Sequence, residues 1–450
     1  MQKLLFARIE VWALLLLILL GILGLVGFGG LVIDHTTGRH RFGALGNAAV
    51  AVAKVPLTLE EVVSGKDPMM VFHNTGFDGQ TGWSWTSHPQ AGGYWVSSWF
   101  DATRRRSEIA MVRLSDGEVV HRWLPDYGAM LDTAAHTSRI AQFVNWTNGK
   151  YKVYHPSLQA DGSLVIKAEY TPLLAIDGCA NPVWTQDSLM FHHSTEPDGN
   201  SGWWSPTVIE PTAVTGVSPR FEDDGLTHVA ADGTVLETIS LTEVLLRHGL
   251  QHLVFQVGDY DDDPLHLNDI QPVLTDGPYW KAGDLFLSLR HRSMVMLYRP
   301  STDEIVWMQQ GPWMGQHDVD ILNDHTIAIF NNRGQSRTNG SGTVDGTSEV
   351  LIYDFATGTI TNPLQAPMAR EKVEALYEGL YTYLPGGEVV IEDHNSGRIL
   401  FLAANGDMIG QFINRNPDGK VYEIGWGVYV DQAAGDAALA LWAAQTCTAG

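Results

Sequence analysis

The sequence predicts an all-β fold, a six-bladed β-propeller preceded by an N-terminal transmembrane helix. After residue 68, short runs rich in Val, Ile, Tyr, Trp and Phe alternate with turns built from Gly, Asp and Asn, the pattern of hairpin strands. These runs recur in tandem units of about four strands, which is the size of a propeller blade. Ahead of them stands one long apolar stretch. A pair of β-sandwiches is the alternative architecture, but it does not explain the tandem units.

The apolar stretch from Val11 to Ile33 carries no charge and is long enough to span the hydrocarbon core of a bilayer. The alternative is a cleaved signal peptide, which usually has a shorter apolar run followed at once by a small-residue cleavage site. Here "DHTTGRHRF" follows instead. We therefore expect a cytoplasmic N-terminus at 1–10, an uncleaved signal anchor at 11–33 and a linker at 34–68. The expected location is the inner (plasma) membrane, single-pass, with the propeller on the periplasmic or extracellular side.

The expected propeller domain covers residues 69–430, and residues 431–450 form an Ala-rich tail that is either helical or disordered. Within the domain only "SLTEVLLRHG", at 240–249, has a helical pattern. The acidic run "DYDDDP", at 259–264, has the composition of a solvated loop. Six blades are expected, near 70–125, 150–188, 190–245, 264–310, 315–362 and 375–414.

The charge and the cysteine content exclude several classes of function. The 450 residues carry a formal net charge of -23, which repels nucleic acid, so we expect no nucleic-acid partner. The two cysteines, Cys179 and Cys447, exclude a disulfide framework and have no metal-binding spacing. A single bridge between them could form, but nothing in the sequence favours it.

Four histidines recur where the innermost strands of separate blades begin: His155, His193 (after His192), His266 and His317. In a propeller these strand starts surround one face of the central channel, so the sequence predicts a ring of histidines at the channel mouth. A single histidine at a strand entry is usually a turn residue. Repetition favours a functional ring, because Asn, Asp or Gly would serve a turn better.

A histidine ring suits two kinds of chemistry. Neutral imidazole is a common metal ligand, and Asp269, Asp318 and Asp320 could add carboxylates, as in a metal-dependent hydrolase or lyase. The other kind is nucleophilic or acid-base catalysis on an anionic group. Arg333 follows the strand that begins near His317, and a guanidinium there would repel a divalent metal and bind a sulfuryl or phosphoryl oxygen. We therefore expect no metal and no cofactor.

At these residues the sequence resembles the arylsulfotransferase family (bacterial arylsulfate sulfotransferases, ASST). The matching segments are "PLHLNDI", "GQHDVDILNDHTIAIFNNRG" and "YLPGGEVVIEDHNSGRILFL". The resemblance implies a six-bladed propeller that moves a sulfuryl group from an aryl sulfate to a phenol, without a nucleotide sulfate donor (PAPS-independent). It also implies a covalent histidine intermediate, with other histidines and an arginine binding the sulfate. His266, His317 and Arg333 match the family's motif residues.

The family's nucleophilic histidine lies in a later segment, where this sequence departs from the pattern. The last innermost strand begins at Glu378 and Gly379, and His394, at a hairpin turn, is the only histidine after residue 325. Loss of the nucleophile would favour the competing class, a non-catalytic membrane-tethered propeller that binds or scaffolds. The expected partners are an aryl sulfate, a phenol and the membrane. The expected catalytic residues are His317, His266 and His394, and the expected substrate-binding residues are Arg333, His193, His155, Asn268 and Trp313.

Overall fold

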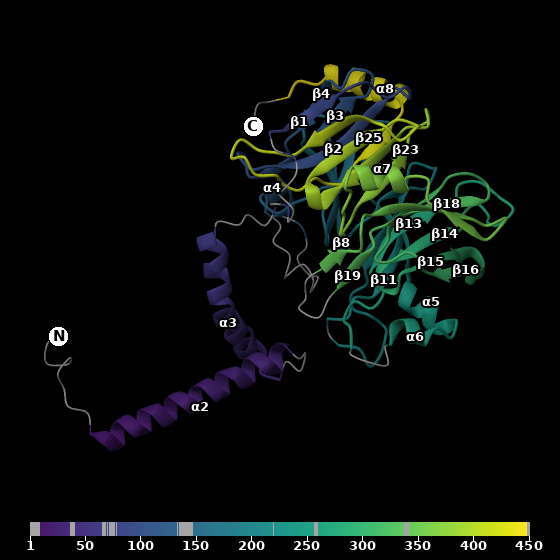
Figure 1. Cartoon of the computed structure of the whole chain (residues 1–450). Helices are drawn as coiled ribbons and strands as arrows, with labels where there is room; N and C mark the ends of the chain where they lie inside the picture. Colours follow the sequence, from purple (N-terminus) through teal and green to yellow (C-terminus); the bar gives the residue numbers. More distant parts are fainter. Residues whose placement is uncertain are drawn as a thin grey trace. The chain divides into compact units, whose positions relative to one another are not determined.

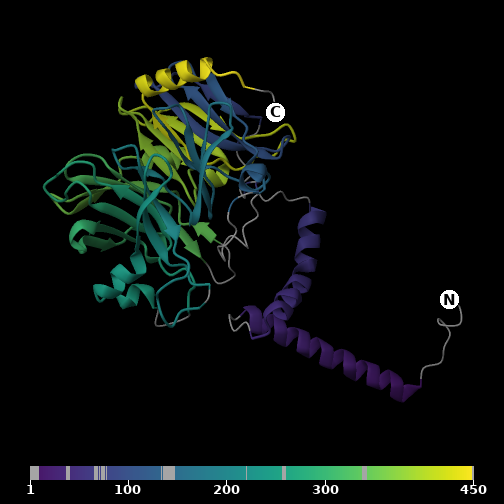
Figure 2. The ribbon, with the colours of Figure 1, turned by 180° about the vertical axis from the view of Figure 1, so that it is seen from behind.

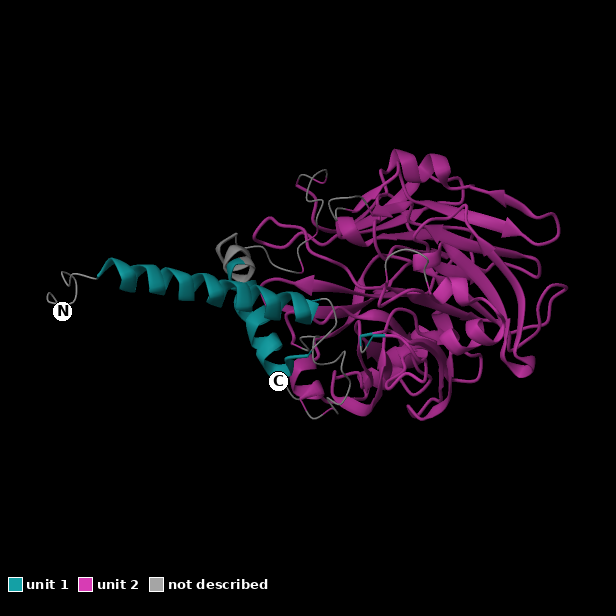
Figure 3. Cartoon of the chain, turned by 90° about the horizontal axis from the view of Figure 1, so that it is seen from below, with its two compact units in different colours: residues 1–68, 218–220 teal, residues 69–217, 221–450 magenta. Residues whose placement is uncertain are grey.

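The computed structural model describes residues 10–36, 41–64, 69, 71, 77, 79–132, 134, 147–218, 220–255, 260–336 and 342–447. Residues 1–9 of the expected cytoplasmic segment lie outside the described residues. The chain divides into two compact units, residues 1–68 with 218–220 and residues 69–217 with 221–450 (Figure 3).

The first unit consists of two helices, α2 (Val11–Thr36) and α3 (Gly43–Ser64). By length and composition α2 can cross a membrane, although a signal sequence near the N-terminus meets the same criteria. The segment 34–68, expected as a linker, contains α3, a helix that the sequence pattern did not predict. Its first half, "GALGNAAVAVAK", is rich in Ala, the strongest helix former, which outweighs the β-branched valines. Asp34, in α2, and Arg41, just before α3, form an ion pair of 2.6 Å.

The second unit is mostly β, with a propeller-like arrangement of antiparallel sheets (Figure 1). The first sheet has the order β27 (Val428–Val430), β2 (Tyr94–Asp101), β3 (Arg106–Arg113), β4 (Val119–Trp123). The next has the order β12 (Val235–Ser240), β11 (Asp224–Val229), β10 (Trp203–Val208), β8 (Pro182–Phe191), β7 (Thr171–Ile176), β6 (Leu164–Lys167), β5 (Tyr154–Leu158), with β9 (Glu196–Pro197) beside β10.

Three further large sheets follow. They are β13 (Leu267–Pro272), β14 (Leu285–Leu289), β15 (Met294–Arg299), β16 (Glu304–Gln310); then β17 (His317–Ile321), β18 (Thr326–Asn331), β21 (Glu349–Asp354), β22 (Thr359–Thr361); then β23 (Leu380–Tyr383), β24 (Val389–Asp393), β25 (Arg398–Leu402), β26 (Met408–Ile413), β1 (Gly82–Trp85). A small hairpin, β19 (Gly334–Ser336) and β20 (Gly342–Val344), stands apart. The short helices are α4 (Tyr127–Leu131), α5 (Leu241–Arg247), α6 (Gln251–Val254), α7 (Gln365–Arg370), η1 (Arg290–Arg292), η2 (Pro300–Thr302) and η3 (His394–Ser396).

Strand pairing does not give six separate blades. The blades expected at 150–188 and 190–245 are joined into one sheet, because the end of β8 pairs with β10 through Phe191 opposite Thr207 and Met190 opposite Val208. The mostly-β, propeller-like fold is therefore confirmed, and the count of six stays a prediction.

The two ends of the second unit are held by strands taken from the opposite end of the chain. The early strand β1 completes the sheet of β23–β26, and the late strand β27 pairs with β2, so blue and yellow strands lie side by side in Figures 1 and 2. The tail is a helix, α8 (Gln432–Ala443), lying over β2–β4 with Trp442 in the core. A disulfide joins Cys179 and Cys447 beyond it. The bridge that the sequence did not favour is present.

The hydrophobic clusters lie between neighbouring sheets, which suits blades packed face to face. One cluster joins the β13–β16 and β17–β22 sheets, and it contains Trp313, which is 1% exposed beside Phe286 and Val319. The expectation that Trp313 binds substrate stays a prediction, because no contact among the described residues joins it to the histidine cluster or excludes the role. Its indole fills the gap between two blades.

Candidate functional site

The five histidines that the sequence singled out gather around one residue that it did not, Trp426. Ring centroids of His193, His155, His317 and His394 lie 6.0, 6.1, 6.3 and 6.3 Å from that of Trp426. His266 joins through His193, at 4.9 Å. We call these five histidines and Trp426 the histidine cluster. They come from the starts of β5, β13, β17 and β27, from the segment before β9, and from η3.

Trp426 had a signal in the sequence, because it stands between two glycines. A Cβ on Gly425 would come within 2.0 Å of the Val153 carbonyl oxygen, and one on Gly427 within 2.6 Å of the Trp95 ring. Both glycines are therefore needed to let the backbone approach its neighbours and to seat the indole centrally. The indole is 1% exposed, and its Nε1 has no hydrogen-bond partner among the described residues.

The repeated feature at the inner strand starts is a left-handed backbone conformation rather than a histidine. His155, His193 and His266 have φ of 46°, 51° and 52°. In the later sheets Asp318 and Glu378 have φ of 53° and 58°. His317 thus stands one residue ahead of the left-handed position, which corrects the expected common register. Both β13 and β17 have a bulge near this point, between Leu267 and Asp269 and between His317 and Val319.

His317 has its proton position fixed by Asn332. The Asn332 amide nitrogen donates to the carbonyl oxygens of Ala375 (2.8 Å) and Glu378 (2.6 Å), so its oxygen must face the ring. That oxygen lies 2.8 Å from Nδ1 of His317, so Nδ1 carries the proton and Nε2 keeps its lone pair. Burial, helped by the charge of Arg290, holds the pKa of His317 well below its ordinary value. The ring is neutral, with a free basic nitrogen.

His394 is different, although it is 1% exposed and lies in the same cluster. The backbone N–H of Gly379 donates to its Nδ1 over 3.0 Å, and Nε2 faces the Gly425 carbonyl oxygen at 3.3 Å. A backbone N–H can only donate, so Nδ1 accepts and Nε2 holds the proton. Burial lowers the pKa of His394 to about 4. Both nitrogens are used by the backbone, so no lone pair remains for chemistry.

His266 is held by a carboxylate. Its Nδ1 lies 2.5 Å from Oδ2 of Asp263, its backbone N–H donates to the other oxygen at 3.1 Å, and His291 stacks on its ring at 4.4 Å. Burial raises the pKa of Asp263, but the hydrogen bond from His266 and the charges of His266, His291 and His192 together bring the value down to about 2. The ionised Asp263 can balance a proton on His266. It belongs to the acidic run that the sequence assigned to a solvated loop.

The expected sulfate-binding arginine has other partners. The guanidinium of Arg333 pairs with Asp345 at 3.2 Å and with Glu349 at 3.3 Å, and no contact among the described residues joins it to the histidine cluster. Arg290 follows β14, and its backbone N–H donates to the carbonyl of His266. Within the described part of the chain its guanidinium makes no ion pair and lies over the Tyr377 ring at 5.4 Å.

A family model for arylsulfotransferase (ASST) matches residues 163–415, more than half of the 450 residues. The chain belongs to the arylsulfotransferase family. No curated protein matched it significantly. Among solved structures, a protein of unknown function from Bacteroides caccae has a TM-score of 0.46 at 10% identity, covering 74% of this chain and 98% of that one. TolB from Acinetobacter baumannii has a TM-score of 0.41 at 10% identity, covering 85% and 73%. Likenesses this distant carry no argument.

In this arylsulfotransferase-family chain, Glu378 occupies the last strand start, where the sequence lacks a histidine. Its carboxylate pairs with Lys152 at 2.7 Å and accepts from the hydroxyl of Tyr154 at 2.7 Å. Burial raises the pKa of Glu378, but Lys152, His394 and the Tyr154 hydroxyl together lower it by more, to about 2. Glu378 is therefore an ionised carboxylate held in place by its partners.

Asn268, an expected substrate-binding residue, makes a contact within the fold. Its buried amide nitrogen donates to the Gln316 carbonyl oxygen at 2.7 Å and links β13 to the residue before β17.

Two groups of side chains in the described part of the chain have the composition and spacing of metal ligands. They are Glu169 with His192 and His193, and Asp263 with His266 and His291. Each brings three ligand atoms within 4.8 Å of one another. His193 and His266 also belong to the histidine cluster.

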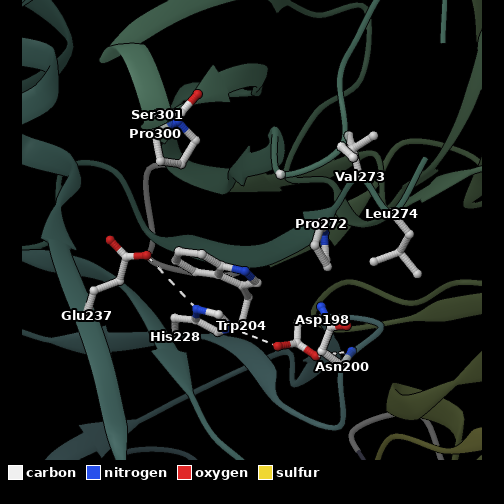
Figure 4. A pocket seen from close by; sticks show the side chains of 12 residues that line it. Asp198, Asn200, Trp204, His228, Glu237, Pro272, Val273, Leu274, Pro300 and Ser301 are labelled. Carbon is white, nitrogen blue, oxygen red and sulfur yellow. Dashed lines mark hydrogen bonds and ion pairs between the residues drawn. The ribbon is translucent and has the colours of Figure 1, made fainter. Parts of the chain in front are cut away.

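A separate pocket of about 440 Å³ lies between the β10–β12 strands and the β13–β16 sheet (Figure 4). His228 stacks on Trp204 at 4.6 Å and its Nε2 meets Asp198 at 2.8 Å, with Glu237 at 4.0 Å from Nδ1. Asp198 also accepts from the backbone N–H groups of its own turn. These contacts order the turn and the ring, and they supply no group left free for chemistry.

Proposed function

We propose that this member of the arylsulfotransferase family moves a sulfuryl group from an aryl sulfate to a phenolic acceptor, without a nucleotide donor, through a sulfohistidine on Nε2 of His317. The observation that carries the proposal is the fixed tautomer of His317. Among the two buried histidines whose proton positions the backbone and Asn332 determine, His317 has a free lone pair and His394 does not. A nucleophile needs that lone pair.

In the first half-reaction Nε2 of His317 attacks sulfur, the N–S bond forms and the S–O bond to the aryl group breaks. The departing phenolate takes the proton from Nε2 of a protonated His266, whose charge the Asp263 carboxylate balances over 2.5 Å. In the second half-reaction the acceptor phenol gives its proton to His266 and its oxygen attacks sulfur, so the N–S bond breaks. Two separate half-reactions give ping-pong kinetics.

Arg290, rather than Arg333, is the guanidinium that we assign to the sulfuryl oxygens. Its charge acts on the pKa of His317, so it lies within electrostatic reach of the nucleophile. It is not neutralised by a paired carboxylate within the described residues, whereas Arg333 has two. His155 and His193 complete the donor set around the developing charge. Trp426 supplies an aromatic wall for the aryl ring.

We further propose that α2 anchors the chain in the plasma membrane with the second unit on the periplasmic or extracellular side. The Cys179–Cys447 disulfide supports this side, because disulfides persist in oxidising compartments. The eight-stranded sheet is proposed to be two blades joined through β8 and β10, which would make six in all.

The direct test is transfer from para-nitrophenyl sulfate to phenol by the purified full chain, followed by release of nitrophenolate and formation of phenyl sulfate. Wild type is expected to show both, with parallel lines in a double-reciprocal plot as ping-pong kinetics requires. If no aryl sulfate product forms from phenol or from any other phenolic acceptor tried, the transferase assignment is refuted and the non-catalytic scaffold remains. A variant with His317 changed that still transfers at the wild-type rate would refute the assigned nucleophile.

A further inference from the structure

We propose that Glu169, His192 and His193 form a site for a divalent transition metal of the zinc class, built into the wall of the histidine cluster. Resting on the proposed function, the inference adds that this metal fixes the proton of His193 on Nε2, the nitrogen left to face a sulfuryl oxygen.

Two of the three separations between the ligand atoms match those around one metal ion, and the third is within 4.8 Å. Nδ1 of His192 and Nδ1 of His193 are 2.9 Å apart, and Nδ1 of His193 is 3.3 Å from Oε1 of Glu169. Ligands bound to one zinc at about 2.0–2.1 Å lie about 2.9–3.4 Å apart for angles between square and tetrahedral. Two histidines and one glutamate also leave a fourth position open, as catalytic zinc sites do.

The two imidazoles converge because the backbone holds them so. His193 has the left-handed φ of 51°, which brings its ring to the same side as that of its neighbour His192. The buried ammonium of Lys167 donates to the His193 carbonyl oxygen and keeps that conformation in place. Without a metal, one of two facing Nδ1 atoms must carry a proton. With a metal, both present lone pairs to it.

A second observation supports the site independently. Nε2 of His192 is buried and makes no hydrogen bond of normal geometry among the described residues, although the Thr207 backbone lies near the ring, and a carboxylate oxygen, Oδ1 of Asp224, lies 3.7 Å away. When Nδ1 of a histidine binds a metal, its other nitrogen carries the proton and usually faces a carboxylate or carbonyl. Asp224 is positioned for that role, because its other oxygen accepts from the Leu267 N–H at 3.2 Å. Oε2 of Glu169 is also buried without a partner.

The cation next to this site is Lys167, whose charge acts on both imidazoles, and not Arg333. Arg333 was expected to repel a metal, but its charge is met by Asp345 and Glu349. Glu169 offers a carboxylate oxygen to the ion directly, and the Asp224 carboxyl group stands behind His192. His193 also lies 4.9 Å from His266, ring to ring, so a metal here adjoins the proposed proton donor without sharing its ligands.

The test uses the detergent-solubilised full chain, purified without chelator and analysed for metals, then stripped and titrated with Co²⁺ while visible absorption is recorded. We expect close to one zinc-class ion per chain and a saturable Co²⁺ band. Asp224→Asn should weaken Co²⁺ binding by about 10–100-fold, as loss of such an outer partner does. Glu169→Gln and His192→Gln should weaken it further. His325→Gln, which removes a surface histidine paired with Asp324 at 2.6 Å, is the matched control and should bind as wild type does.

Equal Co²⁺ affinity in wild type and in Glu169→Gln would overturn the metal site, as would the absence of any saturable band. Glu169 is 30% exposed in its side chain, so this variant is expected to fold even if His192→Gln does not. Sulfuryl transfer is measured on the same samples. Metal binding without transfer would refute the proposed function and keep the site. Transfer without metal binding would refute the site alone.

Discussion

Replacing His317 by Asn tests the chemistry of the ring without breaking its hydrogen bond. The Asn side-chain nitrogen falls where Nδ1 of the imidazole stood, so it can still donate to the Asn332 oxygen, which His317 reaches over 2.8 Å. The substitution removes Cε1 and Nε2 with its lone pair, and it puts the Asn oxygen near the place of Cδ2. We therefore expect a folded protein that binds aryl sulfate and transfers nothing.

The stability difference between two variants measures that hydrogen bond. His317→Ala leaves the Asn332 oxygen buried and unpaired, because its amide nitrogen is held by Ala375 and Glu378 and cannot turn. An unsatisfied buried acceptor costs about 1–3 kcal/mol. His317→Asn keeps the donor, so its free energy of unfolding should exceed that of His317→Ala by about this amount. The cavity left by Asn is smaller than that left by Ala, which adds to the difference. Urea denaturation of the two variants gives the value.

The activity assay is nitrophenolate release under single-turnover conditions, with His394→Asn as the matched variant in the same cluster. We expect His317→Asn to lose transfer by about 10⁴-fold or more, as removal of a nucleophile does. His394→Asn should keep most of its turnover wherever it folds, and added imidazole should partly restore His317→Ala but not His394→Ala. The reverse order, with His394→Asn inactive and folded and His317→Asn active, would show that the tautomer argument fails.

Three further predictions follow from the same contacts. Arg290→Met should raise KM for the aryl sulfate by about tenfold or more. Arg333→Met should leave transfer unchanged and lower the stability by about 0–1 kcal/mol, as loss of an exposed ion pair does. Equal effects of the two variants on KM would contradict the assignment of Arg290 to the sulfuryl oxygens. Asp263→Asn should slow transfer from unactivated phenyl sulfate by about 10²–10⁴-fold and transfer from para-nitrophenyl sulfate far less, because only the poor leaving group needs a proton. Equal losses from both donors would argue against an acid role for His266. Burial raises the pKa of Glu392 from its ordinary 4.5 to about 8. As the pH rises, the unfolded chain loses this proton before the folded chain does. The stability that protonated Glu392 contributes is therefore complete below pH 4.5 and is lost as the pH rises toward about 8, by about 1.4 kcal/mol per pH unit. Glu392→Gln should flatten this slope in urea midpoints measured across the same pH range.

Much of the fold and of the candidate site followed from local sequence. Hydrophobic runs between Gly, Asp and Asn turns predicted the strands, since side-chain alternation and turn chemistry act over a few residues. The uncharged run at 11–33 predicted α2. The segment of α3 was missed because its Val and Gly residues lower the helical signal that its alanines carry. The recurrence of His155, His193, His266 and His317 at strand starts predicted a shared cluster, and the structure brings all four together with His394.

The sequence by itself determined which kinds of residue make up the histidine cluster and to which family the chain belongs. Only the tertiary structure decided what each residue can do there. The lone pair of His317 depends on Asn332, whose orientation is fixed by carbonyls more than forty residues further on, and that of His394 is taken by the Gly379 N–H. The partners of Arg333 and the central place of Trp426 are likewise contacts between distant segments. Proton position and charge compensation depend on which groups are neighbours in space, and a linear sequence does not contain that information.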